Sequence, residues 1–227
     1  MINYKNGFSL TFLLVLVLFQ GRGVYGESSI RNYDHVVNNY FRGDLYSQGG
    51  WTLYCGYQFG RDRKTKNGKY IDVDHIYSVS WMLENVECAN RLACYDGSNQ
   101  GFMEMESDLH NMYPVWSELV ILRNDLPFGE IEGEDWRFSD CDFEWDSRVV
   151  EPRAIARGNI ARAIFYMHDT YDLPIKPGML ETLRQWNRTD PPSKQEQYRN
   201  NRIEELQGRR NRFIDTPSLA EELPRND

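Results

Sequence analysis

An acidic residue followed directly by a histidine, Asp74-His75, is the residue pair in this sequence best suited to chemistry. A carboxylate is an oxygen ligand of the kind that hard metal ions prefer, and an imidazole can take up or release a proton near neutral pH. A second histidine follows in the stretch Asp108-Leu109-His110-Asn111. These residue types predict a site with one metal ion and one base.

Short elements must position these residues. The run from Tyr70 to His75 predicts a strand that ends at the histidine, and the stretch from Ser117 to Asn124 predicts a short helix after the second histidine. The order therefore predicts a strand, a strand and a helix built around one metal ion.

The remaining pattern is mixed. Apolar residues from Tyr33 to Phe41 predict an N-terminal helix, which should end near Gly43. Residues 51–59 read as a strand and residues 61–69 as a basic turn. We expect residues 80–105 to be mostly irregular, with a short helix at their start.

The C-terminal third predicts helices. An amphipathic pattern covers residues 152–171, a second apolar stripe follows Pro177, and Ser193 with Glu196 forms a capping box for a segment that Gly208 closes. The fold class we expect is α+β, a single mixed domain that is largely helical.

The first 26 residues read as a secretory signal. Lys5 gives a thin positive start, Phe12 to Phe19 is an unbroken apolar run, and Gly26 is a small residue suited to cleavage. A membrane anchor is the alternative, but the run is well short of the ~20 residues that a span needs. We expect one domain over residues 27–215 and an acidic, disordered tail over residues 216–227.

The four cysteines fit export, because disulfides persist in an oxidising compartment. Cys88 and Cys94 enclose only five residues, so a local bridge is plausible, which would leave Cys55 to pair with Cys141. Three connectivities are possible in principle. A zinc site is the alternative, but no close Cys-x-x-Cys or Cys-His cluster supports it.

The net charge of −8 argues, taken alone, against a nucleic-acid partner. Its distribution is uneven: eight carboxylates and one arginine lie between Glu130 and Asp146, whereas five arginines and two glutamates lie between Arg199 and Arg212. A basic surface on an acidic protein is one interpretation of the second segment. A solvated helix face is the other.

Taken together, the motifs resemble the endonuclease I family, secreted or periplasmic nonspecific nucleases with a ββα-metal site. The resemblance covers nearly the whole mature chain in the family's order. The matching residues are Tyr54-Cys55-Gly56, Asp74-His75-Ile76-Tyr77, Asp108-Leu109-His110-Asn111, Pro114, Glu118, Arg123, Pro127-Phe128-Gly129-Glu130, Glu151-Pro152-Arg153, Arg157-Gly158, Ile160-Ala161-Arg162, Phe165-Tyr166-Met167, Gln207-Gly208, Asn211 and Phe213-Ile214.

The resemblance implies roles for three residues. Asp74 would hold the metal ion, although the family's usual acid there is Glu, and His75 would be the general base that takes a proton from the attacking water. Arg91, three residues before Cys94, matches the family's phosphate-contacting arginine. The metal would be Mg²⁺, with Ca²⁺ and Mn²⁺ as alternatives. His110 and Asn111 would support the site.

One departure from the family falls at Val120. The family has a metal-binding Asn at this position, two residues after the Glu that Glu118 matches, and a valine side chain has no lone pair to offer. The metal would then bind through Asp74, water and substrate phosphate, or another residue such as Asn124 would take part.

Three hypotheses for function follow. The first is a metal-dependent, sequence-nonspecific endonuclease acting on DNA, with RNA left open, whose backbone contacts come from Arg91 and from Arg153, Arg157 and Arg210. The second is a catalytically impaired family member that keeps the fold and nucleic-acid binding. The third is a secreted interaction domain. We expect a monomer, secreted or periplasmic, without a membrane partner after signal removal.

Overall fold

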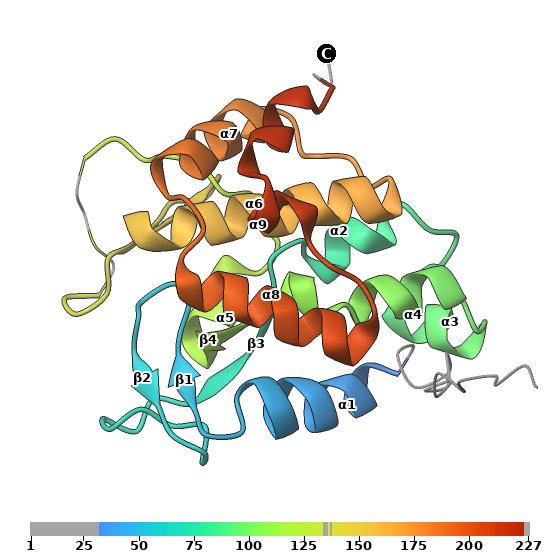
Figure 1. Cartoon of the computed structure of the whole chain (residues 1–227), viewed down its shortest axis with the longest axis horizontal. Coiled ribbons are helices and arrows are strands. Elements are labelled where there is room, and N and C mark those ends of the chain that lie inside the picture. Colours follow the sequence, from blue (N-terminus) through green and yellow to red (C-terminus); the bar gives the residue numbers. More distant parts are fainter. Residues whose placement is uncertain (1–31, 134–135, 137, 225–227) are drawn as a thin grey trace, which may run out of the picture.

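The computed structural model describes residues 32–133, 136 and 138–224 (Figure 1). The predicted signal segment, residues 1–26, lies outside this part of the chain. The helical elements are α1 (Tyr33–His35), η1 (Val36–Leu45), α2 (Val79–Leu83), α3 (Arg91–Asp96), α4 (Gln100–Glu106), η2 (Leu109–Asn111), α5 (Ser117–Arg123), α6 (Ala154–Tyr171), α7 (Met179–Thr189), α8 (Lys194–Gln207), α9 (Arg212–Asp215) and η3 (Pro217–Glu222). The strands are β1 (Gly50–Trp51), β2 (Gln58–Phe59), β3 (Ile71–His75), β4 (Met112–Trp116), β5 (Phe143–Trp145) and β6 (Val150–Pro152).

The strand, strand and helix predicted around the Asp-His pair are confirmed. Strands β3 and β4 pair antiparallel, with Asp74 opposite Tyr113 and His75 opposite Met112. Helix α5 follows β4 directly and contacts β3. Three small antiparallel sheets accompany a largely helical chain, so the α+β fold class is also confirmed.

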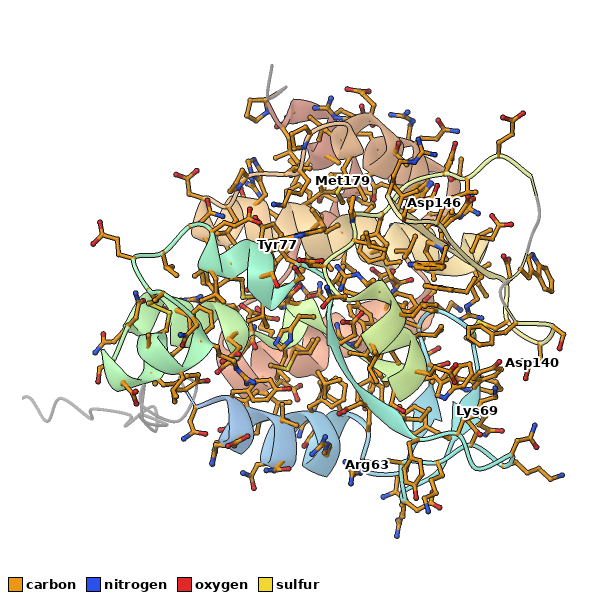
Figure 2. The ribbon with its side chains drawn as sticks, turned by 180° about the vertical axis from the view of Figure 1, so that it is seen from behind. Arg63, Lys69, Tyr77, Asp140, Asp146 and Met179 are labelled. Carbon is orange, nitrogen blue, oxygen red and sulfur yellow. A yellow bond between two sulfur atoms is a disulfide. The ribbon has the colours of Figure 1, made fainter. Side chains whose placement is uncertain are left out.

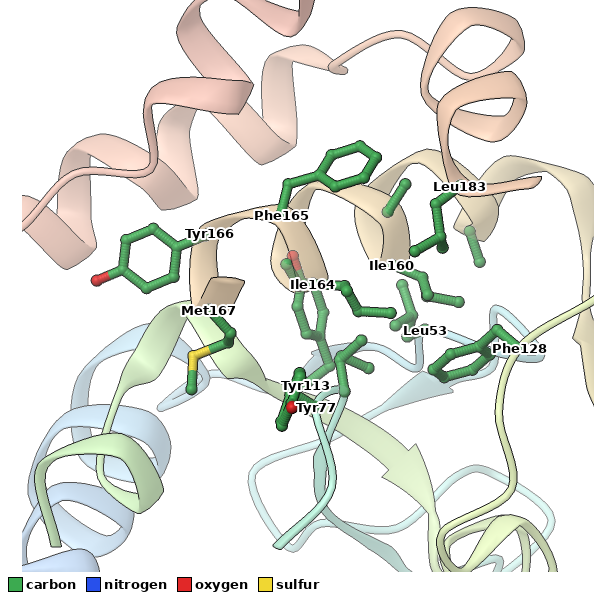
Figure 3. Packing of buried hydrophobic residues seen from close by; sticks show 14 of the residues in the cluster. Leu53, Tyr77, Tyr113, Phe128, Ile160, Ile164, Phe165, Tyr166, Met167 and Leu183 are labelled. Carbon is green, nitrogen blue, oxygen red and sulfur yellow. The ribbon is translucent and has the colours of Figure 1, made fainter. Parts of the chain in front are cut away.

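Helix α6 lies at the centre of the core (Figures 1 and 3). Its side chains are buried on several sides, and Ile160, Ile164 and Met167 are fully covered. The guanidinium of Arg162 is buried too, and it donates to both carboxylate oxygens of Glu196 on α8, at 2.7 and 2.6 Å. Polar groups in the buried middle of a helix need internal partners of this kind.

Two of the sequence predictions for the N-terminal half are wrong. Residues 51–59 are not one strand, because the backbone turns back at Gly56, whose φ of +67° favours glycine, and the two-residue strands β1 and β2 pair with each other. Residues 80–105 are mostly helical, since Asn90 and Asn99 accept hydrogen bonds from Ala93 N and Phe102 N and so begin α3 and α4.

The start of the acidic tail is also ordered, contrary to the prediction of disorder. Residues Pro217–Glu222 form the 3-10 helix η3. The buried Arg184 of α7 donates to the carbonyl oxygens of Ala220, at 3.0 Å, and Leu223, at 2.6 Å. These two hydrogen bonds hold the chain against α7.

Two disulfides join the four cysteines as the spacing favoured. One bridge links Cys88, which precedes α3, with Cys94 inside that helix. The other links Cys55 with Cys141 across 86 residues. The longer loop contains β3, β4 and all the helices from α2 to α5. No helix among the described residues has the length and apolar character of a membrane span.

Candidate active site

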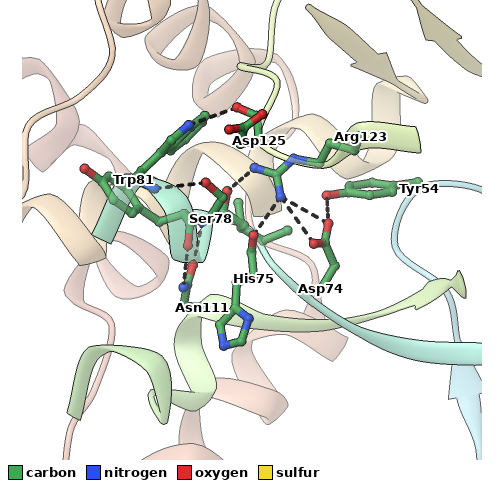
Figure 4. A network of polar contacts seen from close by, with 10 residues as sticks. Tyr54, Asp74, His75, Ser78, Trp81, Asn111, Arg123 and Asp125 are labelled. Carbon is green, nitrogen blue, oxygen red and sulfur yellow. Dashed lines mark hydrogen bonds and ion pairs between the residues drawn. The ribbon is translucent and has the colours of Figure 1, made fainter. Parts of the chain in front are cut away.

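Asp74 lies near the end of β3 with its carboxylate buried (Figure 4). The hydroxyl of Tyr54 donates to Oδ2 at 2.5 Å, and Nη1 of Arg123 lies 3.3 Å from both carboxylate oxygens. Burial raises the pKa of Tyr54 well above its usual value, and the neighbouring carboxylate raises it further, so this hydroxyl stays protonated and donates. Tyr54 matched a family motif in the sequence, but its hydrogen bond to Asp74 was not predicted.

Arg123 of α5 fixes the backbone at the site. Its side chain is fully buried, and it donates to the carbonyl oxygens of His75 and Ile76, both at 2.7 Å (Figure 4). One guanidinium therefore holds the carboxylate of Asp74 and the main chain of the next two residues. The rigid fork of arginine suits this arrangement better than the point charge of lysine would.

His75 is held in one tautomer. Its Nε2 lies 2.8 Å from the carbonyl oxygen of Glu106, and because a carbonyl only accepts, Nε2 carries the hydrogen and Nδ1 carries the lone pair. Burial lowers the pKa of His75, so the imidazole is neutral at pH 7. The residue keeps 8% of its surface exposed. A neutral imidazole with a free Nδ1 is a competent general base.

Glu106 links the histidine to Arg91. Its backbone carbonyl binds His75, while its fully buried carboxylate pairs with Nε of Arg91 and accepts a hydrogen bond from the Tyr95 hydroxyl. The Arg91 side chain is half exposed. The ion pair with the carboxylate therefore orients the guanidinium of a residue that lines a surface pocket. The role of Glu106 was not predicted from the sequence, although this residue lies two residues before the Asp-Leu-His-Asn motif.

His110 and Asn111 make internal hydrogen bonds, as expected of residues that support the site structurally. The Asn111 amide accepts from Tyr77 N at 2.7 Å and donates to Tyr77 O at 3.0 Å, which pins the chain just after β3. His110 is 1% exposed, and its Nε2 donates to the carbonyl oxygen of Arg209 at 3.1 Å. Neither side chain contacts solvent appreciably.

The donor set for a metal ion is small. Val120 is partly buried against the main hydrophobic cluster, and the exposed Asn124 donates to the carboxylate of Asp125 at 2.9 Å. Among the described residues, no group of three His, Cys, Asp or Glu side chains could hold a metal ion. Asp74 thus offers one carboxylate, which fits a hard cation that keeps most of its waters, as Mg²⁺ does, better than one that needs six or more protein oxygens.

The arginines predicted to bind substrate have internal partners. Arg153 donates to the carbonyl oxygen of Leu53 at 2.9 Å, Arg157 pairs with Glu151 at 2.5 Å, and Arg210 pairs with Glu204 and Asp215. The structure does not bring any of the three together with His75. Their role in substrate binding stays a prediction.

The basic segment from Arg199 to Arg212 is largely neutralised by neighbouring acids. Arg202 pairs with Asp44, Arg209 with Glu104 and Arg212 with Asp169. The basic turn between β2 and β3 is less completely paired, although Lys69 lies 4.0 Å from Asp140 (Figure 2). The charge of Arg91, by contrast, acts on the imidazole of His75, whose pKa is lowered by burial and also by this charge.

Comparison with known proteins gives matches over most of the chain. The endonuclease I family model matches residues 22–218. An extracellular deoxyribonuclease of Aeromonas hydrophila is 30% identical over 168 residues, which cover 71% of this chain and 72% of that protein. A periplasmic deoxyribonuclease of the same organism is 31% identical, with coverage of 71% and 69%. An extracellular ribonuclease of Bacillus amyloliquefaciens is 30% identical over 52% of this chain and 46% of its own length.

Proposed function

The chain belongs to the endonuclease I family, and from this premise we propose that it is a metal-dependent, sequence-nonspecific endonuclease that hydrolyses phosphodiester bonds of DNA. The observation that carries the proposal is the arrangement around Glu106. Its backbone fixes the tautomer of His75, and its side chain orients Arg91. Glu106 therefore holds both the proposed base and the proposed phosphate-binding group.

His75 would begin the reaction. Its Nδ1 takes the proton from a water molecule as that water attacks the phosphorus and the bond from phosphorus to the leaving oxygen breaks, while Nε2 keeps its hydrogen bond to the Glu106 carbonyl. That carbonyl also stabilises the imidazolium that forms. Because burial lowers the pKa of His75, the ring is in its reactive neutral form at neutral pH.

Arg91 would hold the substrate. Its planar guanidinium can donate two parallel hydrogen bonds to a phosphate group, and Glu106 restrains it at the opposite side through Nε. Contacts to phosphate and sugar carry no sequence information, so a site of this kind cuts without regard to sequence.

Asp74 would hold the metal ion, which we propose is Mg²⁺. When bound, the ion would neutralise the charge that develops on the phosphoryl and leaving oxygens. Tyr54 and Arg123 orient the carboxylate by donating to it. The Arg123 guanidinium also reduces the negative charge that this single carboxylate can offer.

The compartment and the substrate class agree with the relatives. The protein is secreted or periplasmic, as the sequence predicted: its relatives bear extracellular and periplasmic names, and two disulfides fit an oxidising compartment. Three relatives from Aeromonas hydrophila that align over 71% of this chain are named deoxyribonucleases, and two relatives from Bacillus that align over 52% of it are named ribonucleases. We therefore propose DNA as the main substrate.

A catalytically impaired protein is the second candidate, and Val120 is the observation that favours it. Replacing an amide ligand with an apolar side chain removes a metal contact, and Arg123 competes electrostatically for the same carboxylate. In this case the fold and phosphate binding remain while turnover is lost.

Plasmid cleavage separates the two candidates. Oxidised protein is incubated with supercoiled DNA and Mg²⁺, with and without chelator, beside His75→Ala and Val120→Asn. We expect the wild type to nick the plasmid, and we expect chelator and His75→Ala each to abolish nicking. Cleavage that survives either treatment contradicts the mechanism. A silent wild type with an active Val120→Asn variant establishes the impaired protein instead.

A further inference from the structure

Tyr33, near the start of the first helix, lies between the two groups that carry the proposed chemistry. Its ring centroid is 5.5 Å from that of His75, with the planes tilted by 33°. The guanidinium carbon of Arg91 lies 4.9 Å from the same ring centroid. One aromatic side chain therefore contacts both the proposed base and the proposed phosphate-binding group.

These contacts occur beside an open hollow. Tyr33 and Arg91 line a surface pocket of about 550 Å³ together with Leu92 and Tyr95, and Leu92 is 68% exposed. Arg91 therefore borders space that a phosphate can enter. The Tyr33 ring forms part of the wall next to it.

We propose that Tyr33 is a positioning residue that fixes the Arg91 guanidinium relative to the imidazole of His75; this inference rests on the proposed function. The Arg91 side chain is half exposed, and its Nε pairs with a carboxylate oxygen of Glu106. A cation–π contact with Tyr33 adds a second point of attachment. Two attachments restrict the plane in which the outer nitrogens lie.

The ring, and not the hydroxyl, carries this role. The pKa of Tyr33 is raised to about 12, chiefly by burial, so the phenol stays neutral and offers no charge to either neighbour. Both of the contacts described above are made by the aromatic face. The conservative substitution Tyr33→Phe should therefore preserve the effect, and Tyr33→Leu should remove it.

The structural alternative is that Tyr33 merely anchors its helix. Tyr33 does pack against a small apolar cluster formed by Val36, Val37, Phe41, Val73, Leu109, Met112 and Ile203. Tyr40 on the same helical segment packs against that same cluster, but its ring contacts His35 instead of the site. Tyr40→Leu is therefore a matched control for lost helix anchoring.

A double-mutant cycle tests the proposal. Binding of a fluorescent single-stranded oligonucleotide is measured by anisotropy in chelator at low salt for wild type, Tyr33→Leu, Arg91→Ala and the double variant. We expect Tyr33→Leu to weaken binding about three- to tenfold in the wild-type background, and less than about twofold once Arg91 is alanine. Tyr33→Phe and Tyr40→Leu should bind within about twofold of wild type.

Equal effects of Tyr33→Leu in both backgrounds overturn the proposal, as does equal weakening by Tyr40→Leu. Thermal unfolding of each variant shows whether the fold is kept, and Tyr33→Phe preserves the test if Tyr33→Leu does not fold. Binding in chelator needs no turnover. Wild-type cleavage in Mg²⁺ is therefore a separate result, and its absence would count against the proposed function without deciding the role of Tyr33.

Discussion

Two buried histidines flank the β3–β4 pair and have similar surroundings. His75 ends β3 and His110 lies just before β4, and in each the Nε2 hydrogen bonds to a backbone carbonyl. Each lies in a segment whose carbonyl oxygens bind a buried arginine: Arg123 binds those of His75 and Ile76, whereas Arg199 binds those of Leu109 and Met112.

Access to the other ring nitrogen separates them. Nδ1 of His110 is buried without a hydrogen-bond partner, and its ring packs against Tyr166 with the centroids 4.5 Å apart. The ring of His75 instead lies beside Tyr33, which lines a surface pocket together with Arg91, and His75 keeps 8% of its surface exposed. The two histidines thus have similar support, and we propose that His75 alone acts as a base. Its place beside a residue that lines the pocket is the difference between them.

The largest expected difference between the histidines is in activity. His75→Ala should lower the cleavage rate by about 10² to 10⁴, because the general base is lost. His110→Gln should lower it by less than about tenfold, since Gln can still donate a hydrogen bond near the Arg209 carbonyl. Initial rates of plasmid nicking measure both. Comparable losses in two folded variants would remove the distinction between the histidines.

The two arginines sharpen the comparison through stability. Arg123→Met should lower the free energy of unfolding by about 3 to 5 kcal/mol, because it leaves the buried Asp74 carboxylate without its counter-charge. Arg199→Met removes the hydrogen bonds to the carbonyl oxygens of Leu109 and Met112 and should lower it by about 2 to 3 kcal/mol. Urea titrations of oxidised protein measure both values. The reverse order would mean that the charge of Asp74 is compensated elsewhere.

The third expected difference is a pH dependence of stability, which is small over any single pH unit. Burial lowers the pKa of His110 to about 4, whereas an unfolded histidine titrates near its ordinary value of 6.5. Between these values the unfolded chain binds a proton that the folded chain does not, so stability falls as pH falls, by about 1.4 kcal/mol per pH unit. Above pH 6.5 the residue contributes no slope.

His110→Gln should therefore flatten this dependence between about pH 6.5 and 4 by that amount. Urea titrations of wild type and variant at matched pH values isolate the effect, because the carboxylates and His75 titrate in both proteins. An unchanged slope would show that His110 takes up its proton in the folded protein.

The sequence predicted the part of the site that depends on local order. The strand ending at His75, the helix after β4 and both disulfide pairings follow from motifs and spacing, and the structure confirms them. The helix N-caps at Asn90 and Asn99 were harder to recognise in the sequence. Asn90 and Asn99 begin helices of only two turns or less, which carry too few residues to show a helical period.

Long-range contacts account for the rest. Glu106 and Tyr33 take part in the site through partners 31 and 42 residues away in the chain, counted to His75. The ordered tail likewise depends on Arg184 reaching backbone carbonyls 36 and 39 residues later. An arginine that binds carbonyl oxygens leaves no complementary charge in the sequence, so composition alone suggested disorder.

The bridge between Cys55 and Cys141 has a consequence for the cell that makes this protein. It closes 86 residues of chain that contain Asp74, His75 and Arg91. Loop-closure entropy assigns a bridge of that length about 4 to 5 kcal/mol, comparable with the whole stability of many domains. The reduced chain in a cytoplasm would then be poorly folded, so nuclease activity would begin only in an oxidising compartment, away from the DNA of the cell that makes the protein.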